Sequence, residues 1–387
     1  MLGFRGAAAL FGALAVTGAV IAGACSVYDP SLLLPPSADS GPPDVKEAGA
    51  PDAREAEAAP PVCPEDFPPG PPAMDDPSDA GDQTFVVALH TLNVGLGDAG
   101  VAGLGYDLDK VYTCCDGGPE SCKAAVTGQA HCDQSGGRDD SAGELLAGLA
   151  KIDSAQFNTT TVSQNLESGA YSVLVQVLHY NGTPNDTSVS VALYASSGVT
   201  NDAGAAWNGS DTWQIDDAFT VNDSGAPLPN HFDPNAYVSD GTLVMHVDFP
   251  LSLGSTGTGS FEIDLASGSI TATVVRSGGG YALRDGQMSG RWNVSALLLA
   301  VQALKVLGSP VCPGSNAYSL IKQQVCQYAD IMNDPTQDLM GKTCDALSLG
   351  IGFTADPAIL GPIVPTPPHG SLCYPDGGAP DATDQCP

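Results

Sequence analysis

The segment 105–143 holds the residues best suited to chemistry in this chain. Its sequence, GYDLDKVYTCCDGGPESCKAAVTGQAHCDQSGGRDDSAG, combines four cysteines with Asp107, Asp109, Asp139 and Asp140. Calcium takes six to eight oxygen ligands, and carboxylates on a loop stiffened by disulfides can supply them. Asp107 and Asp109 point to the same side if they lie on a strand. Asp107, Asp109, Asp139 and Asp140 are therefore the candidate ligands of a calcium site in this segment.

A solvated acidic loop is the competing interpretation of the same segment. The spacing of an EF-hand is absent, so a metal site would have to be assembled from separate turns. The chain also carries 44 acidic residues against 13 lysines and arginines, a net charge of −31. Acidic side chains mostly lie in water. Sequence alone does not decide between these two interpretations.

The familiar catalytic signatures are missing from the sequence. Neither G-x-S-x-G nor H-E-x-x-H nor a P-loop occurs. The run GLGDAG at 95–100 matches G-x-G-x-x-G but leads into more glycine and acid instead of a helix, so it predicts no dinucleotide site. We assign no catalytic and no cofactor-binding residue, and we expect a protein that is not an enzyme. A glycan-directed hydrolase, with two carboxylates brought together only by folding, is the alternative.

The negative charge limits the partners. Phosphate binding requires clustered lysine and arginine side chains, so we expect no nucleic-acid partner. Adhesion to an anionic membrane through basic residues is disfavoured for the same reason. An acidic surface fits divalent cations, or simply solubility outside the cell.

The cysteines predict a disulfide-bonded body. There are eleven, and no C-x-x-C spacing supports structural zinc. Without Cys25, five lie within 63–132 and five within 312–386, so complete pairing requires at least one bridge between the two groups. Adjacent Cys114 and Cys115 should take different partners because of disulfide geometry. We expect Cys63 to pin the preceding segment to the folded body.

The N-terminus predicts export and a lipid anchor. Residues 6–24 carry no charge and are mostly alanine and glycine, as in a signal peptide covering 1–24. The sequence Ala22-Gly23-Ala24-Cys25 resembles the lipobox of bacterial lipoproteins, with Ala22 where that family usually has leucine. The resemblance implies cleavage before Cys25, acylation of its thiol and a place in the cell envelope, at the outer membrane or cell surface. An uncleaved membrane helix is the alternative, because the run is just long enough to span a bilayer.

Two parts follow the signal peptide. Residues 25–82 are rich in proline and acid, with only Lys46 and Arg54 opposing, and predict a disordered tether. From residue 83 the character changes to short β-branched and aromatic runs, which predict a folded domain over 83–372. Residues 373–387 are taken as a C-terminal tail.

The folded domain is expected to be mainly β, a jelly-roll-like sandwich of two sheets. The run 187–198 alternates, placing Val189, Val191 and Leu193 on one face, and FEIDLASGSITATVV predicts a hairpin with a Ser-Gly turn. Further strands are expected at 84–94, 170–182, 213–221, 242–249, 281–284 and 347–353. A helical excursion is expected at 295–308 and 315–333.

The combination of tether, cysteines and aspartates also resembles the uncharacterised surface lipoproteins of myxobacterial-type bacteria. That resemblance implies a non-enzymatic protein at the outer surface. We therefore expect a binding or structural module, with calcium as its candidate cofactor, a membrane as one partner and a glycan or protein ligand as another. Trp207, Trp213 and Trp292 could stack on sugar rings, unless they are buried in the core.

Overall fold

The computed structural model describes residues 63–73, 81–96, 103–115, 118–126, 131–152, 159–221, 228–246, 248–253, 261–306, 308–366, 372–373 and 384–387. The expected signal peptide, the lipidation site Cys25 and most of the tether lie outside these ranges. Within the described ranges, no helix combines the length and the apolar character needed to cross a bilayer.

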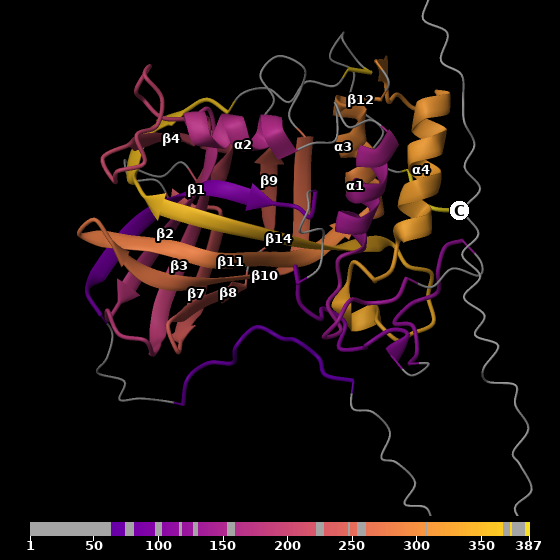
Figure 1. Ribbon diagram of the computed structural model, residues 1–387, viewed down its shortest axis with the longest axis horizontal. Coiled ribbons are helices and arrows are strands. Elements are labelled where there is room, and N and C mark those ends of the chain that lie inside the picture. Colours follow the sequence, from indigo (N-terminus) through magenta and orange to yellow (C-terminus); the bar gives the residue numbers. More distant parts are fainter. Residues whose placement is uncertain are drawn as a thin grey trace, which may run out of the picture. The chain divides into compact units, whose positions relative to one another are not determined.

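Eight antiparallel strands form a closed barrel, which contradicts the expected two-sheet sandwich (Figure 1). The order around the ring is β11–β14–β1–β2–β3–β7–β8–β10, and β10 pairs back with β11 to close it. These strands are β1 (Gln83–Asn93), β2 (Ser172–Tyr180), β3 (Asp186–Ser196), β7 (His231–Ser239), β8 (Thr242–His246), β10 (Phe261–Ser277), β11 (Gly280–Asn293) and β14 (Ala346–Pro357).

Alternating side chains fill the barrel. Val189, Val191 and Leu193 of β3 are all buried, as the alternation predicts. Leu347, Leu349, Ile351 and Phe353 do the same on β14, which lies between β1 and β11. A barrel and a sandwich both require strands with one buried face, so alternation predicts the strands but not the pairing that distinguishes the two folds.

The remaining strands lie outside the ring. β9 (Phe249–Leu253) pairs with the first part of β10. β4 (Thr212–Asp216) and β15 (Ile359–Val364) form a parallel pair, and Trp213 and Ile215 of β4 pack in one cluster with Leu174 of β2 and Tyr194 of β3. This pair therefore covers part of the outer barrel surface. Two short pairs complete the strands: β5 (Thr220–Val221) with β6 (Leu228–Pro229), and β12 (Lys305–Val306) with β13 (Ser309–Pro310).

The expected hairpin at FEIDLASGSITATVV is wrong, because the whole stretch belongs to the single strand β10. The Ser-Gly dipeptide does interrupt the ladder. Ser267 has φ +49°, and the pairing of β10 with β11 shifts register between Ala266 and Ser269. The left-handed residue therefore makes a bulge in a continuous strand and not a turn.

Three helices pack together at one side of the barrel (Figure 1). They are α1 (Ser141–Ile152), α3 (Val294–Ala300) and α4 (Asn316–Tyr328); α2 (Thr159–Ser168) lies against β1. Short 3₁₀ turns follow at Asp217–Phe219, Val301–Ala303 and Pro335–Gln337. α3 is capped by the side chain of Asn293, and only the first part of the expected span 295–308 is α-helical. α1 and α2 have no counterpart among the expected helices.

Five disulfides join the ten cysteines outside the lipobox, as expected. The pairs are Cys63–Cys115, Cys114–Cys132, Cys122–Cys344, Cys312–Cys373 and Cys326–Cys386. Cys114 and Cys115 take different partners, and Cys122–Cys344 is the required bridge between the two groups. Cys63 ties the end of the tether to segment 105–143.

Gly350 provides a test of how closely segment 105–143 packs on β14. A Cβ at Gly350 would lie 2.4 Å from the Gly105 nitrogen and 2.7 Å from its Cα. We expect Gly350→Ala to lower the free energy of unfolding by about 1–3 kcal/mol, because backbone would have to move. Denaturant titration measures this. Gly148→Ala in α1, where a Cβ meets nothing within 4 Å, is the control and should stabilise by about 0.5–1 kcal/mol; equal effects of the two variants would contradict the packing.

Candidate metal centre

Close backbone packing brings the two ends of segment 105–143 together. Gly105 has φ +83°, and a Cβ there would lie 2.7 Å from the carbonyl oxygen of Asp139. The Asp139 amide in turn donates to the carbonyl of Tyr106, at 3.2 Å. Asp107 and Asp139, far apart in sequence, therefore start from adjacent points of the backbone.

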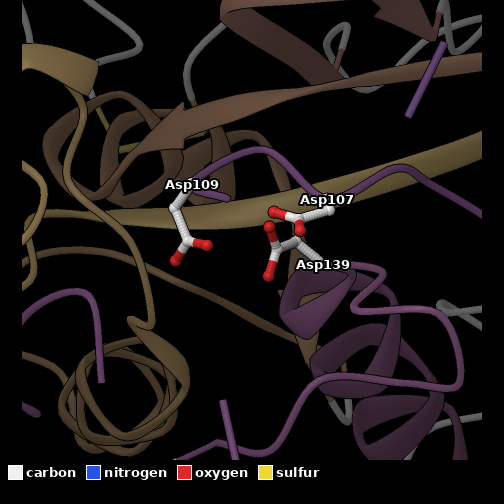
Figure 2. Close-up of side chains that lie close together, drawn as sticks. All are labelled: Asp107, Asp109 and Asp139. Carbon is white, nitrogen blue, oxygen red and sulfur yellow. The ribbon is translucent and has the colours of Figure 1, made fainter. Parts of the chain in front are cut away.

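Three of the four aspartates expected to bind calcium come together. Asp107, Asp109 and Asp139 each offer a carboxylate oxygen, and these oxygens lie within 4.8 Å of one another. Figure 2 shows the carboxylates of Asp107 and Asp139 close to each other, with that of Asp109 to one side. All three side chains are buried, at 4%, 7% and 2% exposure. These three side chains are therefore not part of a fully solvated acidic loop.

Asp140 takes a different role from its neighbour. Its Oδ1 accepts hydrogen bonds from the amides of Gly143 at 3.1 Å and Gly350 at 2.9 Å. The first bond caps the N-terminus of α1, and the second ties that helix to β14. Asp140 thus lies outside the three-carboxylate group and is a structural residue in this fold.

Backbone amides orient the three carboxylates. Asp107 Oδ1 accepts from the Lys110 amide at 2.6 Å, Asp109 Oδ1 from the Val111 amide at 2.9 Å, and Asp139 Oδ2 from the Leu108 amide at 2.7 Å. Asp107 Oδ2, by contrast, is buried and has no hydrogen-bond partner, and the same holds for Oδ2 of the neighbouring Asp140. A buried carboxylate oxygen without a partner is costly, unless a proton or a cation satisfies it.

Burial shifts the titration of the whole group upward. It raises the pKa of Asp107 to about 6, although the Lys110 amide opposes the shift. Burial likewise raises the pKa of Asp109 to about 6. The pKa of Asp139 lies well above its ordinary value, because burial acts together with the negative charges of Asp109, Asp330 and Asp133. Ionising all three carboxylates together is therefore costly, and a nearby positive charge would lower that cost.

Two further aspartates, Asp133 and Asp330, belong to this acidic centre but were not among the residues expected to bind calcium. The Asp133 carboxylate accepts a hydrogen bond from the Thr113 amide, and burial raises the pKa of Asp133 to about 8. Asp330, in the turn after α4, accepts from the Ser141 hydroxyl at 2.7 Å and the Ser348 hydroxyl at 2.6 Å. Asp133 lies within the segment first singled out, but only folding shows that it faces Asp139.

A small cavity adjoins the centre. It has a volume of about 10 Å³ and is lined by polar side chains, among them Asp133, Gln134, Asp139 and Glu144. Both terminal atoms of Gln134 are buried without a partner. A volume of this size holds about one water molecule. The space therefore suits an ion and its water better than an organic substrate.

The ligand chemistry fits calcium. The cysteines of this region, Cys114, Cys115, Cys122 and Cys132, are all in disulfides and supply no thiolate for zinc. The group offers carboxylate oxygens, the ligands that calcium prefers, and the carboxamide oxygen of Gln134 lies beside the same cavity. Three ionised carboxylates would more than balance the two positive charges of the ion.

The three tryptophans are poorly placed for stacking on sugars. Trp213 and Trp292 are fully buried. Trp207 is partly exposed, but its indole stacks on the His90 ring at 3.9 Å between centroids. One face of that indole is therefore already covered by protein.

Comparison with known proteins identifies no relative. The chain matches no family model, no curated protein and no solved structure. What the acidic centre does is therefore inferred from its own residues and their geometry.

Proposed function

We propose that this chain is an exported, lipid-anchored module whose disulfide-bonded barrel binds calcium at Asp107, Asp109 and Asp139. The calcium assignment rests on one observation. Three buried carboxylates have oxygens within 4.8 Å of each other, and Asp107 Oδ2 has no hydrogen-bond partner. Calcium supplies the missing charge and needs no other ligand chemistry than the site offers.

Export and anchoring are supported by the cysteines. Five disulfides are typical of proteins that fold in an oxidising compartment. The lipobox-like sequence at Cys25 supports acylation there, and two or more acyl chains suffice for stable attachment to a membrane. The module would then act in the cell envelope, at the outer membrane or cell surface, as a structural element or as a receptor for a protein or glycan.

The hydrolase alternative gains less support from the geometry. Paired carboxylates of glycosidases flank a sugar ring, which requires an open cleft. Here the three carboxylates are buried, and the cavity beside them, which Asp139 lines, measures only about 10 Å³. The raised pKa values of the acidic centre are as well explained by a missing cation as by acid–base catalysis.

Calcium should stabilise the folded chain. At a free calcium concentration a hundredfold above the dissociation constant, the stabilisation is about 2.7 kcal/mol, which raises the unfolding midpoint of a domain this large by about 4 °C. Thermal melts of the full chain with calcium and with EDTA measure this. Asp107→Asn should lose the shift, whereas Asp202→Asn at an exposed position should keep it. A wild-type midpoint that is the same in calcium and EDTA would refute the proposal.

The calcium effect should grow with pH. Without metal, Asp107 and Asp109 titrate near pH 6 and Asp133 near pH 8 in the folded chain, against an ordinary pKa of 3.8. The folded state then holds more protons than the unfolded state above pH 4, so these groups lower the stability as pH rises to about 8. Calcium must displace those protons to bind.

We therefore expect a larger difference in midpoint between calcium and EDTA at pH 8 than at pH 5.5, measured by the same melts. Carboxylates remote from the site contribute to both conditions at a given pH and cancel in the difference. A calcium shift that is independent of pH, or larger at pH 5.5, would mean that calcium binds somewhere other than these carboxylates.

Cys25 should decide the attachment to the membrane. Cys25→Ala removes the thiol that would carry the acyl chains, so we expect the protein to move from the membrane fraction to the soluble fraction. Immunoblotting of the two fractions measures it, and Ser26→Ala serves as the matched control that stays bound. Retention of the Cys25→Ala protein on membranes would favour the uncleaved-helix alternative.

A further inference from the structure

The end of the tether is bonded directly to the acidic centre. We use the term tether end for residues 63–69. The carbonyl of Asp66 accepts a hydrogen bond from the amide of Asp107 at 3.0 Å, and the Asp66 amide donates to the carbonyl of Gly136 at 2.7 Å. The residue that offers its carboxylate to the calcium site is thus held by its amide on the tether end.

Charges link the same two parts. The Asp66 carboxylate forms an ion pair with Arg138, whose guanidinium also donates to the carbonyl of Gly105, just before Asp107. Burial is the first cause of the raised pKa of Asp107, and the negative charge of Glu65 adds to it. Without a cation, then, Glu65 and Asp107 repel each other at the place where the tether end packs.

The other contacts of the tether end are few. Cys63 is bonded to Cys115, and the hydroxyl of Tyr237 on β7 donates to the carbonyl of Pro69 at 2.7 Å. Three of the seven residues are prolines, which have no amide to donate. Beyond the disulfide at Cys63, residues 64–69 are held on the barrel by the two backbone hydrogen bonds and the ion pair of Asp66 and by the hydrogen bond from Tyr237.

We propose that calcium binding and the docking of the tether end are coupled, so that calcium latches residues 64–69 onto the barrel. The coupling rests on the proposed calcium site. Calcium would remove the repulsion between Glu65 and Asp107 and fix the loop that carries Gly136, and both changes favour the docked tether end. By linkage, a docked tether end must strengthen calcium binding by the same factor. The point where the tether joins the barrel thereby becomes rigid when calcium is bound.

Cleavage by a glutamate-specific protease tests the latch on the full chain. A protease needs a stretch of extended, unbonded backbone, so the bond 65–66 is cut only when the tether end undocks. The bond 167–168, after the exposed Glu167 of α2, is the internal control. Products are analysed after reduction, because Cys63–Cys115 otherwise keeps the fragments together.

The measured quantity is the ratio of the cleavage rate at 65–66 to the cleavage rate at 167–168. We expect this ratio to be at least tenfold lower in calcium than in EDTA. An unchanged ratio in a protein whose melting midpoint does respond to calcium would overturn the latch and leave the calcium site standing. An unchanged ratio together with an unchanged midpoint would overturn both.

Calcium titration of two variants tests the reverse direction. Asp66→Asn removes the ion pair with Arg138, and we expect it to weaken calcium binding at least fivefold and to speed cleavage at 65–66 in calcium. Glu120→Gln also removes one negative charge, but from an exposed position of segment 105–143, and it should change the calcium affinity less than twofold. Equal losses in the two variants would show that only net charge matters and would overturn the coupling.

Discussion

The constraint on which this structure depends is the repulsion among carboxylates held away from water. An isolated buried ion costs several kcal/mol even after relaxation of its surroundings. Asp330 meets that cost with hydroxyl and amide donors from Ser141 and Ser348. Asp107 has one oxygen with no such donor, and Asp133 and Asp139 face one another. The centre therefore concentrates negative charge that its own donors do not fully compensate, and a proton or a cation would compensate it.

The scaffold around this centre is built to resist that repulsion. The described residues of segment 105–140 form no long helix or strand before α1, so covalent and ionic links replace backbone ladders there. Cys122–Cys344 joins it to the residues before β14, and Cys114–Cys132 closes it on itself. The buried Arg291 of β11 donates to the carbonyl of Leu108 at 2.8 Å while paired with Asp338. These links hold the carboxylates together in the absence of a ligand, which lowers the entropy cost of binding one.

Several features were predictable because they depend on local sequence. Period-two alternation located β1, β3 and β14, and the parity of the cysteines required a bridge such as Cys122–Cys344. The closed barrel was not predictable in this way, because it depends on which strands pair. β7 shows another limit: Pro234 argues against a strand, yet it lies where the pairing of β3 with β7 shifts register, and a proline is tolerated at such a bulge.

The acidic centre shows the same division between local and non-local information. Asp139 and Asp140 are adjacent in sequence, which suggested that they act together. However, α1 begins directly after Asp140, at Ser141, and separates their roles. Asp140 becomes the cap of α1, and its neighbour turns toward Asp107. Asp330 lies just after α4, and nothing in the sequence around it marked it as part of the site, because a single aspartate after a helix is common. The type and local number of acidic residues therefore indicated the chemistry of the site. Which aspartates form it follows from the close approach of Gly105 to Asp139 and to Gly350, which only the folded chain displays.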